Sequence, residues 1–270
     1  MNDLGLDVSK LLAWFAHAQD SPYALIQVSD EHAAAWAEVL GLPLRRCYIA
    51  DAVLDIHAER TGRPKAELLA AKLPDRGSVM AGDFGEILVF LYHAALEHPQ
   101  TVIGPKKWRL KQDRTKPAPC SDVVHFVVPS WPLASEQDRV LCSEVKLKST
   151  ARDSSPIALA VAGCEKDRIS RLVKTLAWLR ERALHEDLGT TTIDHIERFI
   201  NAADHPPALK QFRAVAVVCS SLVNEELAKA PAVAPADYSV VIIAVPDLKD
   251  HYEAVFDAIH ATVADPGEST

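Results

Sequence analysis

Apolar residues recur every three or four positions over most of the first 74 residues, which is the spacing of amphipathic helices. The stretch ends in the turn signal PDRG. One short run, YALIQV at residues 23–28, is rich in large apolar residues and permits a strand there. The pattern therefore predicts a mainly helical region over residues 1–78. Its helical segments are DVSKLLAWFAHAQ, EHAAAWAEVLG, ADAVLDIHAERTG and KAELLAAK.

The pattern changes at Gly82. The segment GDFGEILVFLYHAALE is apolar on nearly all sides, which is typical of a helix inside a domain. After a long basic connection, SDVVHFVVP and DRVLCSEVKLKS are rich in β-branched residues and predict two strands that pair as a hairpin. Two helices are predicted next, at EKDRISRLVKTLAWLRERALHE and TIDHIERFINAA.

The C-terminal third alternates two continuous apolar runs, FRAVAVVCS and YSVVIIAVP, with the helical segments NEELAK and HYEAVFDAIHATV. Continuous apolar strands separated by helices are typical of parallel strands that are covered on both faces. We therefore expect an α/β fold with a mixed central sheet flanked by helices, in a domain that spans residues 79–270. The last residues, DPGEST, are expected to be loose.

The composition is that of an ordinary soluble protein. With 270 residues and 49% hydrophobic content, the chain can bury one substantial core. No apolar run reaches the roughly 18 to 20 residues of a membrane span, and the first residues, MNDLGLDVSK, lack the basic flank of a signal peptide. We therefore expect a cytoplasmic protein without membrane attachment. The five cysteines form no CxxC pair, which argues against a zinc knuckle and a disulfide framework.

Charge is segregated along the chain. The net charge is -8, but residues 105–182 hold 16 Lys or Arg against 9 Asp or Glu, whereas the rest holds 13 bases and 28 acids. The basic part contains the two predicted hairpin strands. A positive surface there would suit a polyanionic substrate. The alternative is that a charged helix and a basic loop occur there by accident.

Three acids and one lysine are the candidate chemistry. Glu86 opens the apolar helix, Asp122 opens the first hairpin strand, and Glu144 and Lys146 lie in the second. Hairpin pairing would bring Asp122 close to Glu144, and Lys146 and Lys148 share a strand face with Glu144. Carboxylates from separate elements can hold a hard divalent cation such as Mg²⁺ or Mn²⁺, while a lysine can steady the attacking water or the charge on a phosphate. The alternative is an exposed edge strand with a solvated face. The candidate catalytic residues are Glu86, Asp122, Glu144 and Lys146, with Asp122 and Glu144 as metal ligands.

Glu86 is a separate indication of a metal site. A carboxylate in the first turn of an all-round apolar helix is costly unless it meets a cation, a donor or the helix N-terminal amides. A cap on an exposed helix end is the alternative, but the acids on the following strands make a role beside the metal the better explanation. His93 would share the helix face of Glu86, and a packed core histidine is the favoured interpretation.

The basic connection PKKWRLKQDRTK interleaves Trp108 with six bases and one acid. Bases can contact phosphates and an aromatic ring can stack on a nucleobase, so the predicted nucleic-acid contacts are Lys106, Lys107, Lys111 and Lys148. A solvated loop is the alternative. Acids partly offset the bases of the helix that follows Cys164, which needs no nucleic acid to explain it; these bases are Lys166, Arg168, Arg171, Lys174, Arg180 and Arg182.

Several common enzyme motifs are missing. The sequence contains no HExxH, no GxSxG, no P-loop, and no GxGxxG with an acidic partner. Readings as a zinc hydrolase, a serine hydrolase, an NTPase or a dinucleotide enzyme therefore have no support.

Taken together, GDFGE, the basic connection, SDVVH and SEVKLKS resemble the HamA and AbpA-like family, the nuclease subunits of the Hachiman anti-phage defence system, within the PD-(D/E)xK nucleases. The resemblance covers about residues 82–150 by motif and the C-terminal part by the order of elements. Asp122, Glu144 and Lys146 match the D…ExK residues of the family, and Glu86 matches its helix glutamate. The proline that the family has before the first acid is absent here, where Ser121 precedes Asp122.

The resemblance implies a restriction-endonuclease-like core, Mg²⁺-dependent or Mn²⁺-dependent cleavage of DNA, and restraint by a HamB-like helicase partner. The residues themselves leave three functions open: a metal-dependent DNA nuclease, a catalytically silent nucleic-acid-binding or assembly subunit, and a structural subunit. The acid set favours the nuclease, because a module that only binds phosphate gains nothing from converging carboxylates. The acidic N-terminal helices are the predicted docking surface, because DNA would repel them.

Overall fold

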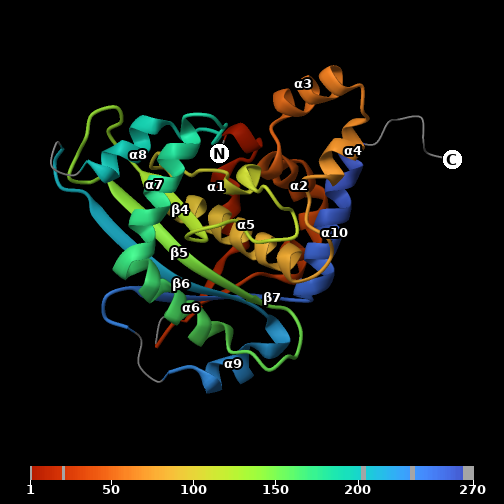
Figure 1. Ribbon diagram of the computed structural model, residues 1–270. Helices are drawn as coiled ribbons and strands as arrows, with labels where there is room; N and C mark the ends of the chain where they lie inside the picture. Colours follow the sequence, from red (N-terminus) through yellow and green to blue (C-terminus); the bar gives the residue numbers. More distant parts are fainter. Residues whose placement is uncertain (1, 20–21, 202–204, 232–234, 264–270) are drawn as a thin grey trace.

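The computed structural model describes residues 2–19, 22–201, 205–231 and 235–263. A seven-stranded mixed sheet with the order β1-β2-β7-β6-β5-β4-β3 forms its centre (Figure 1). The pairs β2/β7, β7/β6 and β6/β5 are parallel, and the remaining pairs are antiparallel. The predicted α/β fold with a mixed sheet is confirmed. The strands are β1 (Ala16–Gln19), β2 (Ala24–Gln27), β3 (Val102–Ile103), β4 (Val123–Val127), β5 (Arg139–Lys148), β6 (Leu209–Cys219) and β7 (Ser239–Val245).

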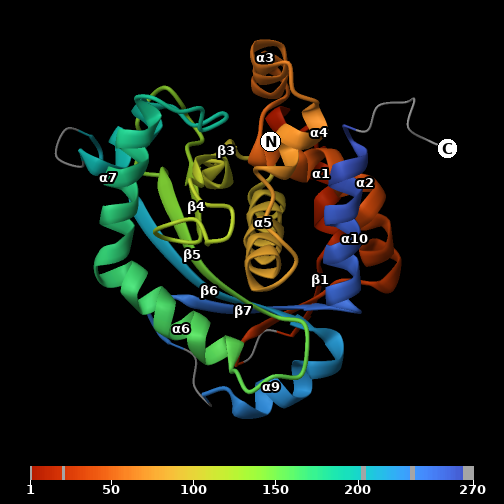
Figure 2. The same cartoon turned by 45° about the vertical axis from the view of Figure 1, so that its right-hand side comes forward.

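Helices cover both faces of the sheet. On one face lie α5 and, beside it, α2 and α10; on the other lie α6, α7, α8 and α9 (Figure 1, Figure 2). The helices are α1 (Val8–Leu11), α2 (Asp30–Tyr48), α3 (Asp51–Thr61), α4 (Lys65–Ala70), α5 (Ser78–Glu97), α6 (Pro156–Lys166), α7 (Leu172–Ala183), α8 (Ile193–Ile200), α9 (Val223–Lys229) and α10 (Leu248–Ala261).

Strand β6 shows why the C-terminal strands are continuously apolar. Ala214 and Ala216 face the cluster formed with α6 and α9, whereas Val215 and Val217 face the cluster formed with α5. Alternate side chains of a strand point to opposite faces, and here each face is covered by helices. The predicted parallel pairing of β6 and β7 is confirmed.

The N-terminal region differs from its predicted pattern at one segment. Residues 7–19 were expected to be a single helix, but α1 ends at Leu11, a 3₁₀ turn follows, and residues 16–19 form β1. That part of the prediction is wrong, because pairing with β2 at the edge of the sheet outweighs the helical spacing. The strand permitted at residues 23–28 is confirmed as β2. Residues 1–78 therefore add two strands to the sheet, and the domain boundary after residue 78 stays a prediction.

The predicted core helix is confirmed as α5, although it begins at Ser78 and not at Gly82. It is long and apolar enough to cross a membrane by length and composition alone, and its burial within the protein accounts for that composition. Gly85 lets the helix approach β5 closely, since a Cβ atom there would lie 3.2 Å from the side chain of Leu147. This packing places the middle of α5 against the second half of β5.

One long helical segment follows β5. The helix predicted at residues 165–186 covers the end of α6, a π-helical turn at Asp167–Arg171, and α7. The helix predicted at residues 192–203 is confirmed as α8, and its last predicted residues, together with the DPGEST tail, lie outside the described residues.

Candidate active site

Strand β5 is longer than its neighbour β4, and this difference opens the site. Pairing with β4 begins at Val123 opposite Ser143, so residues 144–148 of β5 keep β6 on one edge, and no strand of the described chain pairs with their other edge. The open edge faces a cleft of about 910 Å³. The start of α5, the loops at residues 117–120 and 149–154, and the start of α10 complete its walls.

Asp122 closes the open edge of β5. Its Oδ2 atom accepts a hydrogen bond of 2.8 Å from the backbone N–H of Val145, which has no strand partner on that side. A buried backbone donor without an acceptor would be costly, so this bond holds the Asp122 carboxylate beside the strand. The hairpin pairing therefore places Asp122 next to the neighbouring residues of β5, as the sequence predicts.

Lys146 joins the two candidate metal ligands. Its Nζ atom lies 2.5 Å from Glu144 Oε1, 3.5 Å from Asp122 Oδ2 and 3.0 Å from the carbonyl oxygen of Val145. Glu144 and Lys148 are only 3% and 5% exposed, although the edge of β5 beside them is open. The alternative of a solvated charged face is therefore wrong for these two residues.

Glu144 is held from the other side by the helices. Arg171 Nη2 donates to Glu144 Oε2 at 2.6 Å, so the two carboxylate oxygens meet two different cations. Burial raises the pKa of Glu144, and the charge of Asp122 adds to this shift, while Lys146 and Arg171 act to lower the pKa. The same cations stabilise the ionised carboxylate, which is the form that could bind a metal.

Glu86 lies in the third turn of α5, not in the first, because the helix starts eight residues earlier. Helix N-terminal amides therefore cannot be its partners. Its Oε2 atom instead accepts from Trp108 Nε1 at 3.1 Å and lies 3.2 Å from Lys107 Nζ. The pKa of Glu86 is raised to about 8, mainly by burial and also by the charge of Asp122, while Lys107 acts to lower it. Glu86 lines the same cleft as Asp122 and Lys146.

The first part of the basic connection, residues 105–111, does not form a surface loop. Lys106 and Lys111 are buried: Lys106 Nζ lies 3.2 Å from Asp3 Oδ2, and Lys111 Nζ donates to Asp83 Oδ2 at 2.8 Å. A buried ammonium in an ion pair has no surface with which to reach a phosphate. These two lysines, predicted as contacts of nucleic acid, instead attach the 3₁₀ turn Lys107–Leu110 and its flanks to the core.

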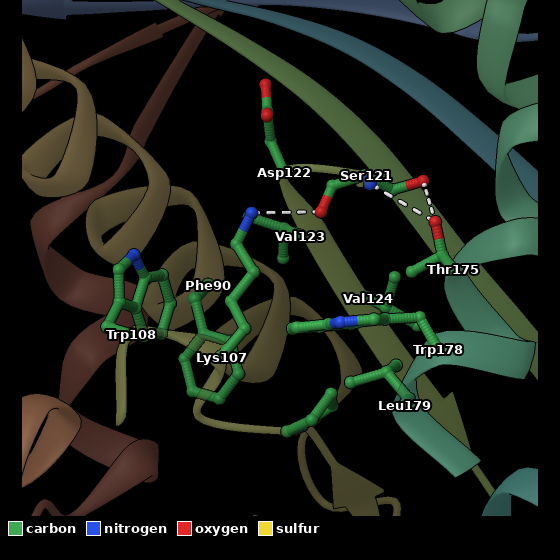
Figure 3. A pocket seen from close by; sticks show the side chains of 11 residues that line it. Phe90, Lys107, Trp108, Ser121, Asp122, Val123, Val124, Thr175, Trp178 and Leu179 are labelled. Atoms are coloured by element: carbon green, nitrogen blue, oxygen red, sulfur yellow. Dashed lines mark hydrogen bonds between the residues drawn. The ribbon is translucent and has the colours of Figure 1, made fainter. Parts of the chain in front are cut away.

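Lys107 and Trp108 are buried in the same way. Lys107 donates to the carbonyl oxygen of Ser121 at 2.9 Å, and the Ser121 backbone N–H donates to Thr175 Oγ1 at 3.1 Å (Figure 3). Figure 3 also shows the Asp122 carboxylate pointing away from the side chains of Lys107 and Trp178. Lys107 is therefore buried away from the surface, and it holds the residue before Asp122.

The remaining predicted phosphate contact is also buried. Lys148 donates to Glu226 Oε1 at 2.7 Å and to the carbonyl oxygen of Ser154 at 2.8 Å. This ion pair joins the end of β5 to α9 and to the loop that borders the cleft. Lys148 is structural for the same physical reason as the lysines of the basic connection.

Lys148 lines the cleft with its ammonium held in this ion pair, and five other bases line the cleft as well. Lys146 and Arg171 lie at its floor, and Arg152 is exposed on the loop after β5. Arg76 and Lys249 line the opposite wall. The helical pattern around Arg171 indicates an ion pair with Asp167 four residues earlier, but nothing in the sequence indicates the π-helical turn that directs Arg171 to Glu144. His93, in contrast, packs against Tyr92 and His125 in the core, as the favoured interpretation predicts.

Within the described residues, no group of three or more His, Cys, Asp or Glu side chains could hold a metal ion. The donor set available at the cleft is two carboxylates, from Asp122 and Glu144, and the carbonyl of Val145. These three oxygens already surround the cationic Nζ atom of Lys146. An all-oxygen set of this kind suits a hard cation such as Mg²⁺ or Mn²⁺.

The mixed seven-stranded sheet with helices on both faces defines an α/β protein, in which Asp122 directly precedes β4 while Glu144 and Lys146 lie on the adjacent β5. A family model described as HamA matches residues 16–259, which is nearly the whole chain. The chain therefore belongs to the HamA family and is related to the Hachiman defence system. A search among curated proteins finds no match.

Proposed function

We propose that this protein is a metal-dependent DNA nuclease that acts in the cytoplasm as the effector of an anti-phage defence system. One observation carries the proposal: Asp122, Glu144 and the Val145 carbonyl converge on one cationic position at the open edge of β5, inside a large cleft. A module that only bound DNA would gain nothing from two carboxylates at that point, because they repel phosphate.

In this proposal Asp122, Glu144 and the carbonyl of Val145 would hold Mg²⁺ or Mn²⁺. A bound divalent cation would lower the pKa of a water molecule and offset phosphate charge. Lys146 is partly exposed and can turn its ammonium from the carboxylates toward the scissile phosphate. There a positioned positive charge would stabilise the charge that develops in the transition state.

Glu86 would support this arrangement from α5. It is bonded to Trp108 and Lys107, and Lys107 in turn holds the carbonyl of Ser121. Because Ser121 directly precedes Asp122, this chain of contacts would keep the Asp122 carboxylate in place. Partners of this kind commonly orient the groups that bind a metal.

DNA would be held by the bases that line the cleft. Arg152 is exposed, and within the described residues Arg76 and Lys249 pair with Glu253 and Asp257 at the surface of α10. Surface ion pairs contribute little free energy, so a phosphate could replace the acid at small cost. Contacts of this type read the backbone and not the sequence of DNA. We therefore infer cleavage without sequence specificity.

A nuclease of low specificity needs restraint from outside its active site. We propose that a helicase partner supplies it by docking on the N-terminal helices, where α3 projects away from the sheet (Figure 2). Residues 1–78 carry 11 Asp or Glu against 8 Lys or Arg, so this part of the protein has no basic surplus that would attract DNA and is left free for a protein.

The experiment is incubation of the purified protein with plasmid DNA and Mg²⁺ or Mn²⁺, alone and with the candidate helicase. We expect cleavage that EDTA abolishes and that Glu144→Gln lacks, and we expect the helicase to suppress it until damaged or single-stranded DNA is added. DNA binding without any cleavage, under all these conditions, would support the catalytically silent subunit instead.

A further inference from the structure

The structure contains an arginine that acts on Glu144 from the helical side. We propose that Arg171 is a positioning residue of the active site, which fixes the Glu144 carboxylate in the orientation that binds the metal ion. This inference rests on the proposed function and extends it to a residue that the D…ExK pattern does not contain.

Three short contacts hold the Arg171 guanidinium. Its Nη2 atom donates to Glu144 Oε2 and to the carbonyl oxygen of Gly163, each at 2.6 Å, and its Nε atom donates to Asp167 Oδ1 at 2.6 Å. Asp167 is buried and also accepts from the hydroxyl of Ser121 at 2.6 Å. A planar guanidinium with three fixed acceptors has little freedom, so it holds the carboxylate that it contacts.

The local backbone is shaped for this contact. Between Asp167 and Arg171 the helix widens into a π-helical turn, in which the N–H of Leu172 donates to the carbonyl oxygen of Asp167. Such turns are rare and occur frequently at functional sites. On the preceding turn, Gly163 leaves the space that Glu144 occupies, since a Cβ atom there would lie 2.3 Å from Glu144 Oε1.

Arg171 leaves Glu144 Oε1 for a metal ion. It uses Oε2, whereas Oε1 faces Asp122 and the Val145 carbonyl across Lys146. Asp167 balances the charge of Arg171, so the pair adds little repulsion toward a cation at Oε1. What Arg171 supplies to Glu144 is therefore mainly orientation.

The test is a titration with MnCl₂, followed by electron paramagnetic resonance, of the wild-type protein and of Arg171→Ala, Arg171→Lys and Asp167→Asn. We expect Arg171→Ala to weaken Mn²⁺ binding by about 10-fold to 100-fold, as loss of such a partner commonly does. Arg171→Lys should recover part of this loss, because a lysine can reach one of the three acceptors. Asp167→Asn should weaken binding less, in the same direction.

Arg168 provides the matched control. It lies on the same turn but is exposed and pairs with Glu165, so Arg168→Ala should bind Mn²⁺ like the wild type. Thermal unfolding shows which variants are folded. Wild-type affinity in folded Arg171→Ala would overturn the inference, and if that variant does not fold, wild-type affinity in Arg171→Lys would overturn it.

The same titration separates this inference from the proposed function. If the wild-type protein binds Mn²⁺ but never cuts DNA, and the Arg171 variants bind Mn²⁺ more weakly, the nuclease function is refuted and the positioning role of Arg171 is supported. A wild-type protein that cuts DNA while the Arg171 variants bind Mn²⁺ normally would remove only the role of Arg171. Absence of Mn²⁺ binding by the wild type would overturn both.

Discussion

Gly163 is a residue at which a single methyl group should disturb the site directly. A Cβ atom there would lie 2.3 to 2.5 Å from Oε1, Cδ and Cγ of Glu144, a buried side chain that Lys146 and Arg171 hold, so Glu144 and these contacts must shift. Gly163→Ala should therefore reduce metal-dependent DNA cleavage by about 10-fold or more and also lower the melting temperature. The measurement is the cleavage rate beside the melting temperature.

Gly82→Ala is the matched control for this change. It also adds a methyl group to a helix, but no atom lies within 4 Å of its position, so we expect wild-type cleavage. A folded Gly163→Ala protein that cleaves at the wild-type rate would show that the carboxylate position in the structure does not matter for the reaction.

The buried histidines should make the protein sensitive to acid. Burial lowers the pKa of His93 and of His125 well below the ordinary value, and Arg213 adds to the effect. Below about pH 6.5 the unfolded chain therefore binds protons that the folded protein does not. The free energy of unfolding should not depend on these histidines above that pH. Below it, the free energy of unfolding should fall by about 1.4 kcal/mol per pH unit for each histidine.

Urea unfolding at about pH 7.5 and about pH 5.5 measures this effect. His93→Leu should lose less stability between the two conditions than the wild type, whereas His260→Gln, which changes an exposed histidine, should lose as much. An equal loss in the wild type and His93→Leu would mean that His93 is not the source.

At the scale of elements, the ion pair of Lys148 and Glu226 ties β5 to α9. Both side chains are buried, so Lys148→Ala would leave a buried carboxylate with only a weak contact to Lys229. We expect the free energy of unfolding to fall by about 3 to 5 kcal/mol, measured by urea unfolding. Lys229→Ala, at the exposed end of the same cluster, should cost about 1 kcal/mol or less. A Lys148→Ala protein as stable as the wild type would contradict the structural role and reopen a role in DNA binding.

The same strand shows what could be predicted from sequence. Strand length, β-branched content and alternation are local properties, so β4, β5 and the proximity of Asp122 to Glu144 follow from the sequence. The burial of Lys106, Lys107 and Lys111 depends on acids from distant segments, including Asp3, Asp83 and Glu86, and a basic run in sequence shows none of these partners.

Two further differences have the same origin. The sequence pattern predicts that α5 begins at Gly82, because the glycine interrupts the apolar pattern. In the structure the buried helix tolerates this glycine and begins at Ser78. The π-helical turn before α7 follows from contacts of Asp167 and Thr175 with Ser121, which lies 46 residues away from Asp167 in sequence. Local pattern cannot indicate contacts of this kind.

At the scale of the whole molecule, the fold separates the functions that we propose. The sheet presents the open edge of β5 and the cleft between α5 on one side and the α6–α7 segment on the other. The N-terminal helices α3 and α4 lie at the periphery (Figure 1). This arrangement would let a partner protein bind these peripheral helices while DNA enters the cleft.

Lys146→Ala tests the central claim most directly, because Lys146 stands at the centre of the proposed site and is partly exposed. The measurement is the DNA cleavage rate of this variant at a Mn²⁺ concentration that saturates it. The account predicts a folded protein that binds Mn²⁺ at least as tightly as the wild type, since one competing cation is gone, yet does not cleave DNA. Cleavage at the wild-type rate by Lys146→Ala would contradict the account.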